Sequence, residues 1–232
     1  FFRGVPSLFL WHEKGMIRAM DTSWEWLPVL LALGIALSMQ PWRLLRDTEL
    51  LNPFLGSLVI TPWLWALPRL HTMPLQLQLT GSCMVLLMLG WPLAVPAFCL
   101  IAVLSAWIGH APPQLIMENA FWLGILPATL AMLLGALIRR FIGTHLFVYI
   151  LGRGFFGTVA CVFASSVLHE WAGMSLPHVD PSLTTIAHWL IAWGDGFMTG
   201  MLTAIFVAFR PEWLATWSDG LYFHHPHDPP SA

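Results

Sequence analysis

The sequence predicts an all-α polytopic membrane protein, a helix bundle with about seven transmembrane helices, and three observations carry this prediction. First, 57% of the 232 residues are hydrophobic and 9% are charged, whereas a soluble domain carries about 25% charged residues. Second, apolar stretches close to membrane length recur along the whole chain. Third, these stretches lack the alternation of barrel strands, and backbone groups in lipid must be paired within a helix. Lipid is therefore the solvent for most of the chain.

The first half of the chain contains four expected spans, each near the length of about 20 apolar residues that a membrane helix needs. The third and fourth form a close pair that is separated by Gly90, Trp91 and Pro92. Because Pro and Gly interrupt helices, this break favours a tight reversal over one long helix. The four spans are 26–40, 51–67, 75–90 and 93–109.

The second half of the chain contains three further expected spans, at 116–138, 146–168 and 186–209. The N-terminal residues combine a short apolar run with the charges that follow it, which favours an interfacial segment over a signal peptide. The C-terminal residues contain three prolines that prevent a helix from continuing, so we expect a short extramembrane tail. The expected division is an interfacial segment at 1–23, one transmembrane domain at 24–218 and a tail at 219–232.

The arginines predict the orientation, because short cytoplasmic loops collect Lys and Arg. With seven spans, five arginines fall on one side, whereas Arg69 and the N-terminal basic residues fall on the other. We therefore expect a bacterial inner-membrane protein with a cytoplasmic C-terminus and an external N-terminus. The five arginines are Arg43, Arg46, Arg139, Arg140 and Arg210.

Several classes of function are excluded by composition and motifs. A net charge of −2 provides no basic surface for nucleic acid. The three cysteines lie singly in apolar runs, without the spacing of a disulfide framework or a metal site, and are expected in the core. His169 and Glu170 begin a zinc-protease pattern, but Gly173 stands where the second His is needed. With no nucleophile and base pair visible, we expect no enzymatic activity.

Three charged residues inside the expected spans need an explanation, because each costs about 2.5–3.5 kcal/mol at the centre of a membrane helix. Glu118, Arg153 and Asp195 should therefore face the interior of the bundle. By the helical rise, Arg153 could reach Asp195 on the neighbouring antiparallel span, which predicts an ion pair. In the alternative, Arg153 extends to the headgroups and Asp195 pairs with a hydroxyl group.

Other polar and small residues accompany these charges. Amide and hydroxyl groups at Gln76, Gln78, Thr80 and Asn119 could line a cavity together with the charged groups. Small residues around Asp195 favour close helix packing, or alternatively a polar site lined by backbone near the middle of the membrane. The candidate polar site is Gln78, Glu118, Asn119, Arg153 and Asp195, and the candidate packing residues are Gly194, Gly196 and Gly200.

Histidines provide the candidate metal ligands, because imidazole is the commonest side-chain ligand of transition metals. In the expected topology, four histidines lie near the outer ends of spans and could gather around an external vestibule. In the alternative, each is solvated separately at the interface. The four are His71, His110, His169 and His178, of which His71 and His110 are the candidate ligands.

Several motifs together resemble one family of membrane proteins. The most specific stretch is Phe209-Arg210-Pro211-Glu212-Trp213-Leu214-Ala215-Thr216-Trp217, and the resemblance extends over about 52–223. The other motifs are Leu75-Gln76-Leu77-Gln78-Leu79-Thr80-Gly81-Ser82, Leu89-Gly90-Trp91-Pro92-Leu93-Ala94, Leu146-Phe147-Val148-Tyr149-Ile150, and Gly194-Asp195-Gly196-Phe197-Met198-Thr199-Gly200-Met201. In these motifs the chain resembles the CbiM-like permeases, the substrate-specific membrane components of energy-coupling factor transporters for cobalt or nickel, and in particular a divergent bacterial branch.

The resemblance implies a seven-helix fold with an external N-terminus. It also implies metal capture by an N-terminal Met-His pair and by a His early in the third span. The sequence departs from both features, because it begins with Phe1 and Phe2 and has Gln78 where the resemblance leads us to expect His. An amide is a poorer ligand than imidazole for nickel or cobalt.

Two functions follow from the sequence as hypotheses. The first is a substrate-binding permease component for a transition-metal ion or another small solute, in which any metal ion is the substrate. Its partners would be membrane lipids, other membrane subunits and a separate ATPase, because the sequence has no GxxxxGK[ST] phosphate loop. The second is a non-catalytic accessory subunit of a larger membrane complex. Gln78 favours the accessory subunit, whereas the polar residues around Asp195 favour transport.

Overall fold

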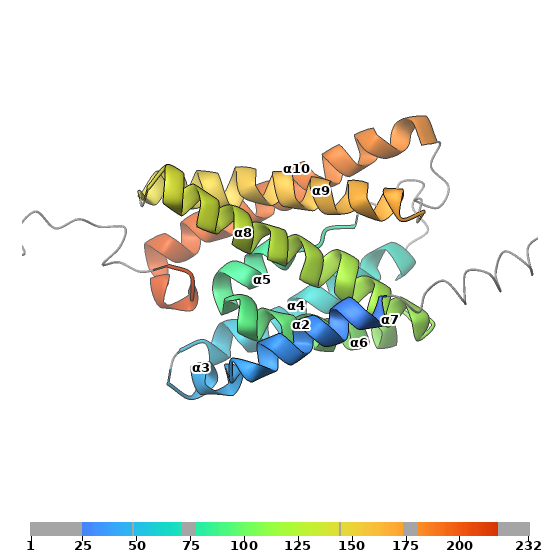
Figure 1. Ribbon diagram of the computed structural model, residues 1–232, viewed down its shortest axis with the longest axis horizontal. Helices are drawn as coiled ribbons and strands as arrows, with labels where there is room; N and C mark the ends of the chain where they lie inside the picture. The colour runs from blue at the N-terminus through green and yellow to red at the C-terminus, as the bar shows by residue number, and fades with distance from the viewer. Residues whose placement is uncertain (1–24, 48, 71–77, 144, 174–180, 218–232) are drawn as a thin grey trace, which may run out of the picture.

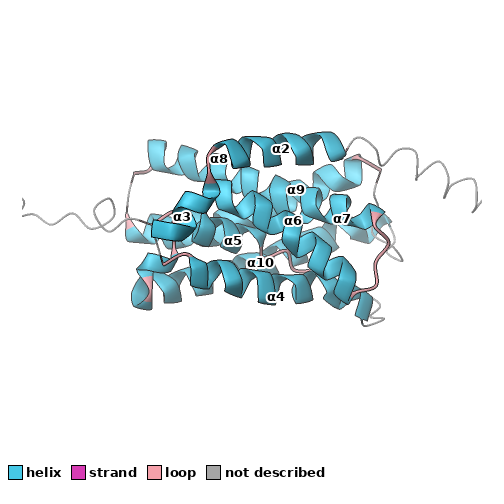
Figure 2. Cartoon of the chain, turned by 90° about the horizontal axis from the view of Figure 1, so that it is seen from below, coloured by secondary structure: helices cyan, strands magenta, loops and turns pink. Residues whose placement is uncertain are grey.

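The computed structural model describes residues 25–47, 49–70, 78–143, 145–173 and 181–217. Within these residues every regular element is a helix, which confirms the predicted all-α bundle. The long helices run roughly along one common direction and pack side by side (Figures 1 and 2). The segments expected at 1–23 and 219–232 lie outside the described residues.

The first two expected spans correspond to two helices and a short connecting helix. α2 (Trp26–Ser38) is apolar but has 13 residues. α3 (Pro41–Asp47) follows it and carries Arg43 and Arg46. α4 (Leu51–Leu70) then returns along the bundle for 20 residues.

The third expected span is not a continuous helix, which corrects the prediction for 75–90. Residues 78–81 form no helix, and α5 (Ser82–Leu89) has only eight residues. Gly81 has a φ of +61°, a left-handed conformation that glycine adopts without strain, so the helix begins only after it. Residues 71–77 lie outside the described part of the chain.

The predicted reversal between the third and fourth spans is confirmed. Gly90 follows α5 with a φ of +73°, and α6 (Trp91–Ile108) begins directly after it. Pro92 lies in the first turn of α6, where its missing N–H has no helical partner to lose.

Three long helical stretches form the second half of the bundle, and two of them contain π-helical turns. The first expected stretch, 116–138, is one continuous rod made of three segments, and 186–209 lies within a single helix. The elements are α7 (Gln114–Asn119), η1 (Ala120–Ile125), α8 (Leu126–Phe141), η2 (Val148–Phe156), α9 (Gly157–Trp171), α10 (Pro181–Phe209) and the 3₁₀ turn η3 (Pro211–Trp213).

Length and composition identify membrane-spanning candidates among the described helices. Four stretches are long and apolar enough to cross a bilayer by themselves: Trp91–Ile108, Gln114–Phe141, Val148–Trp171 and Leu183–Phe209. α2 is apolar but shorter, and α4 is long enough but less apolar. Large apolar side chains also cover much of the outer surface of the bundle. A soluble monomer rarely exposes such extensive apolar surface, so the chain is a multi-pass membrane protein.

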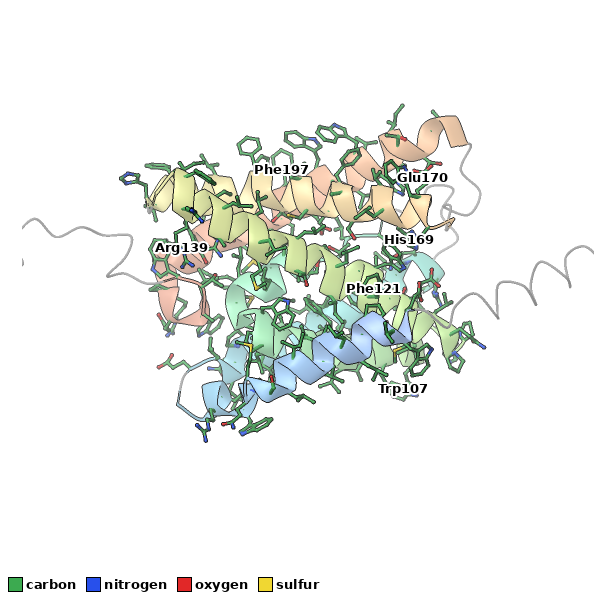
Figure 3. The ribbon with its side chains drawn as sticks, in the orientation of Figure 1. Trp107, Phe121, Arg139, His169, Glu170 and Phe197 are labelled. Atoms are coloured by element: carbon green, nitrogen blue, oxygen red, sulfur yellow. The ribbon has the colours of Figure 1, made fainter. Side chains whose placement is uncertain are left out.

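The two ends of the bundle differ in their charged residues. One end, here called the arginine end, carries α3 with its two arginines, Arg139 and Arg140 at the end of α8, and Arg210 after α10. The opposite end, here called the histidine end, carries His169 and Glu170 (Figure 3). His110, two residues after the end of α6, lies at the same end. The five arginines that were assigned to one side therefore lie at one end, as the expected topology requires, whereas Arg69 lies beside Gly109 at the histidine end.

The short helix α5 forms the centre of the molecule. All eight of its residues are buried. It contacts α4, α6, α8 and α10, so long helices surround it. An interior helix of this kind leaves both of its ends inside protein, and their backbone groups must find partners there.

Candidate functional site

The N-terminal end of α5 is held by Asp195, which lies fully buried in α10. The backbone N–H of Thr80 donates to both carboxylate oxygens, at 3.1 and 2.9 Å. The Thr80 hydroxyl donates to Oδ2 at 2.7 Å, and the N–H of Gly81 donates to Oδ1 at 3.2 Å. A negative charge is also favourable at the positive end of the α5 dipole. Asp195 therefore fixes the point at which the third pass changes from non-helical chain to helix.

The non-helical segment before α5 is attached to α4 as well. The indole N–H of Trp65 donates to the carbonyl oxygen of Thr80 at 2.7 Å. The side-chain amide of Gln78 donates to the carbonyl oxygen of Trp65 at 3.3 Å. Non-helical backbone at membrane depth is tolerated where protein surrounds it in this way. The half-buried Gln78 thus lies on an irregular segment inside the bundle.

Asp195 faces protein, as predicted, but the predicted ion pair with Arg153 is wrong. Asp195 pairs instead with the Thr80 hydroxyl, as the alternative interpretation expected, and also with two backbone amides. The Arg153 guanidinium carbon lies 5.3 Å from the ring centre of Tyr149. Gly135 of α8 provides the space for this side chain, because a Cβ atom there would lie 2.6 Å from Arg153 Nε.

The C-terminal end of α5 is capped by the chain that follows η3. The backbone N–H groups of Ala215 and Thr216 donate to the carbonyl oxygens of Met88 and Leu87, at 3.0 and 3.3 Å. The Thr216 hydroxyl also donates to the Leu87 carbonyl at 2.9 Å and lies 2.7 Å from the Tyr149 hydroxyl. Sequence reasoning missed the role of Thr216. The clue in the sequence was Gly90, which ends the buried helix α5. The last carbonyl groups of such a helix need donors from elsewhere in the chain.

The glycines around Asp195 allow α10 to approach its neighbours closely. A Cβ atom on Gly196 would overlap the side chain of Val159 in α9. A Cβ atom on Gly200 would lie 3.1 Å from the Cβ of Phe155 in η2, and one on Gly194 would lie 3.1 Å from Leu79. Small residues at such crossings let helix backbones pack closely in membranes.

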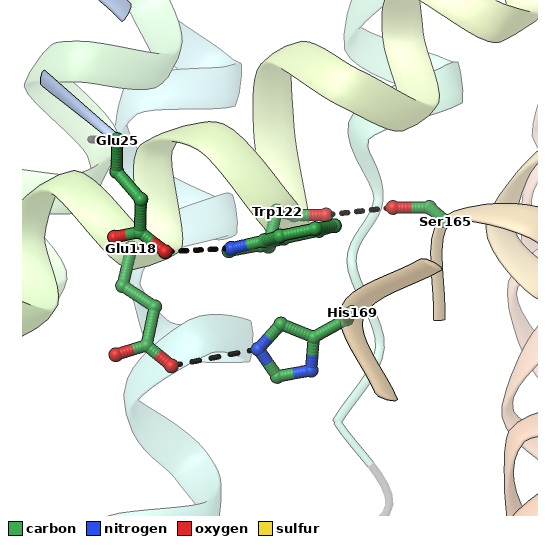
Figure 4. A network of polar contacts seen from close by, with 5 residues as sticks. All are labelled: Glu25, Glu118, Trp122, Ser165 and His169. Carbon is green, nitrogen blue, oxygen red and sulfur yellow. Dashed lines mark hydrogen bonds and ion pairs between the residues drawn. The ribbon is translucent and has the colours of Figure 1, made fainter. Parts of the chain in front are cut away.

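A second group of polar side chains lies at the histidine end, where α2, α7 and α9 all contact η1 (Figure 4). Glu118 Oε1 lies 3.5 Å from His169 Nε2. The indole N–H of Trp122 donates to Glu25 Oε1 at 2.8 Å, and the Trp122 carbonyl accepts from Ser165 at 3.0 Å. The rings of Trp122 and His169 meet edge to face, with centroids 5.0 Å apart. The predicted residue Glu118 thus joins this group, and the sequence analysis missed Glu25.

The other predicted site residues are spread over the molecule. Asn119 is half-buried at the end of α7, and His110 is exposed after α6 with a φ of +48°. A second contact between a histidine and a carboxylate joins Nδ1 of the buried His188 to Glu170, at 3.6 Å. His71 and His178 lie outside the described residues. Within the described residues no three His, Cys, Asp or Glu side chains form a group that could hold a metal ion directly.

The bundle, its buried short helix α5 and its apolar surface define a polytopic membrane protein. The family model for the CbiM cobalt uptake substrate-specific transmembrane region matches residues 19–213. Because this match covers most of the sequence, the chain belongs to the CbiM family, whose members are membrane components of energy-coupling factor transporters and not catalysts. Comparisons with curated proteins and with solved structures find no match.

Proposed function

We propose that the chain is the substrate-binding permease component of a transporter that takes up cobalt or a related divalent transition-metal ion across the bacterial inner membrane. The observation that carries this proposal is the CbiM family match over 19–213. The metal ion is the substrate of this transporter and not a resident cofactor. The membrane component binds and passes the ion, and ATP hydrolysis belongs to another chain.

The architecture around α5 supports the proposal. Transporters bind substrates at interrupted helices near the middle of the membrane, where backbone groups become available. In this chain, Asp195 fixes one end of such an interrupted pass and Thr216 caps the other. Both residues belong to the motifs that carry the family resemblance. The motifs therefore maintain the irregular segment at 78–81, where the family likeness leads us to expect a metal ligand.

The proposal requires partner chains. Membrane subunits accompany the components of this transporter type. A separate ATPase supplies the energy, because the sequence lacks a phosphate-binding loop of the GxxxxGK[ST] type. We propose that the arginine end faces the cytoplasm, where such an ATPase is located.

Metal accumulation in cells tests the proposal. The chain is expressed with the subunits that copurify with it from native membranes, in a strain without cobalt uptake of its own. We expect accumulation of radioactive Co²⁺ that depends on both the chain and the ATPase. The matched control replaces the phosphate-loop lysine of the ATPase partner. Accumulation equal to that of the empty strain for cobalt, nickel, copper and zinc contradicts the proposal.

One observation favours a second candidate function, an accessory subunit that keeps the fold without transporting metal. At position 78 a glutamine replaces the expected histidine, and its amide donates to the Trp65 carbonyl instead of offering an imidazole nitrogen. Metal content after purification without a His tag separates the two functions. Negligible metal in wild type, together with stable copurification of a larger membrane complex, supports the accessory role.

A further inference from the structure

The histidine end contains a buried carboxylate that uses only part of its hydrogen-bonding capacity. Glu25 is fully buried at the start of α2. Its Oε1 accepts the indole N–H of Trp122, whereas its Oε2 is buried and has no hydrogen-bond partner among the described residues. Buried polar atoms in folded proteins nearly always have a partner. Glu25 therefore has an open acceptor position inside the protein.

Two further side chains surround this carboxylate. The His169 ring packs edge to face against the same Trp122 side chain that donates to Glu25. Glu118 and His169 lie 3.5 Å apart, with about a quarter of each side chain exposed. The three residues come from different elements, so the fold and not local sequence brings them together (Figure 4). No Lys or Arg is among the described groups that act on Glu25.

We propose that Glu25, Glu118 and His169 form a binding site for a hydrated divalent cation at the histidine end. This inference rests on the proposed function, because it assigns a first binding position to the transported ion. Carboxylate oxygen and imidazole nitrogen suit divalent first-row metals. The described side chains do not form a group that could coordinate a metal directly. The ion therefore keeps part of its water shell, and these waters bridge to the protein.

The arrangement differs from one that serves stability alone. A structural carboxylate would have both oxygens satisfied, and it would not lie near a second carboxylate. Here the charge of Glu118 acts unfavourably on the buried Glu25 carboxylate, and His169 offsets this effect only when it is protonated. A cation removes this repulsion and supplies a partner for Glu25 Oε2. Glu118 and His169 are partly exposed at the histidine end, so an ion can reach these two side chains from outside the bundle.

Equilibrium binding to the purified full chain in nanodiscs tests the site. The probe is radioactive Co²⁺, and the variants are Glu25→Gln, Glu118→Gln and His169→Gln. We expect each variant to raise the Kd for Co²⁺ about tenfold or more, as the loss of an outer-shell partner of a metal ion does. The matched control is Glu170→Gln, which removes one negative charge at the same end but contacts His188. We expect its Kd to stay near the wild-type value. Equal loss in all four variants overturns the site and indicates a diffuse charge effect.

Thermal unfolding separates cation binding from a structural role. Glu25→Gln keeps an oxygen for the Trp122 indole and removes the buried charge. We therefore expect a higher Tm than wild type without Co²⁺, and loss of the Tm increase that Co²⁺ gives to wild type. A lower Tm with an intact Co²⁺ response identifies Glu25 as structural and overturns the proposal. Glu118→Gln, at a partly exposed position, provides the same test if Glu25→Gln does not fold.

The two experiments distinguish failure of the cation site from failure of the proposed transport function. If wild type accumulates Co²⁺ in cells and the three variants bind and accumulate it equally well, the site is overturned and the transport function stands. If wild type accumulates no metal, but the purified chain binds Co²⁺ in a way that depends on the three residues, the transport function fails and the site stands.

Discussion

At the scale of single residues, Asp195 is the polar group on which the interior of the bundle depends most. It receives three donors from two consecutive residues, the amide and hydroxyl of Thr80 and the amide of Gly81. All of these groups are buried, so none can replace a lost partner by water without rearrangement. Hydrogen bonds to a charged acceptor contribute about 1.5–3 kcal/mol, more than neutral ones.

We predict a graded loss of stability at this contact. Asp195→Leu leaves the buried amides of Thr80 and Gly81 without their acceptor, at a cost of about 1–3 kcal/mol for each amide. The Thr80 hydroxyl loses its charged acceptor and keeps its contact with the Ser82 hydroxyl at 3.1 Å. Thr80→Val removes only the hydroxyl bond and should have a smaller effect. Thermal unfolding of the purified chain in detergent measures both variants. Thr203→Val is the matched control, because the Thr203 hydroxyl bonds a carbonyl of its own helix. Wild-type stability in Asp195→Leu contradicts the prediction.

The sequence predicted that Asp195 faces protein but gave the wrong partner. The cost of a charge in lipid was enough for the first prediction. The partner Thr80 lies 115 positions away and could be recognised only if the third span was known to be broken. Glu25 was missed for a similar reason, since a glutamate beside tryptophans near a span end looks like an ordinary interfacial residue. Its contact with Trp122 spans 97 positions.

At the scale of elements, the third expected span, 75–90, was predicted least well from the sequence. An apolar run of moderate length does not distinguish a helix from a buried extended segment. The break at 78–81 arises from Gly81 and from the donors that Asp195 attracts. The reversal at Gly90 was predictable, because Gly and Pro interrupt a helix regardless of tertiary contacts. The remaining long apolar runs were assigned to helices correctly.

Close packing of α10 against α9 gives a second prediction. Gly196→Ala places a methyl group into the side chain of Val159, and overpacking of this kind costs about 1–3 kcal/mol. Thermal unfolding should therefore show a lower Tm. Gly34→Ala is the matched control, because a Cβ atom there meets nothing within 4 Å, and we expect no loss of stability.

A compensating change checks the cause of this loss. Val159→Ala opens space at the contact, so the double variant with Gly196→Ala should recover part of the stability that Gly196→Ala alone loses. Neighbouring residues in contact are expected to be non-additive in this way. Strict additivity of the two changes would show that the glycine acts through something other than this crossing.

The opposite end of α5 gives a third prediction. Thr216→Val removes the hydroxyl that donates to the Leu87 carbonyl and contacts the Tyr149 hydroxyl. We expect a loss of about 1 kcal/mol, since the backbone N–H of Thr216 still serves the same carbonyl. Tyr149→Phe should give a smaller loss. Limited proteolysis after η3 should become faster in Thr216→Val, and an unchanged rate would contradict a capping role.

At the scale of the whole molecule, the polar groups divide the bundle into two unlike ends. The arginine end collects cations that favour the cytoplasmic side of a membrane. The histidine end contains Glu25, Glu118 and His169, which provide two carboxylate groups and one imidazole group. Exposed tryptophans mark the histidine end, where Trp107 and Trp171 are 78% and 82% exposed, and Trp42 of α3 lies at the arginine end. Such tryptophans favour the headgroup level of a bilayer, so the two ends fit its two surfaces.

This asymmetry predicts which end is accessible from outside the cell. Gln114→Cys places a thiol at the histidine end, on the exposed first residue of α7, and Glu212→Cys places one at the arginine end. A membrane-impermeant maleimide should label Gln114→Cys in intact cells and Glu212→Cys only after permeabilisation. Wild type is the control for background, because Cys83 and Cys161 are buried and Cys99 is partly so. The reverse labelling pattern would invert the orientation, and the proposed cation site would then face the cytoplasm and could not receive an imported ion first.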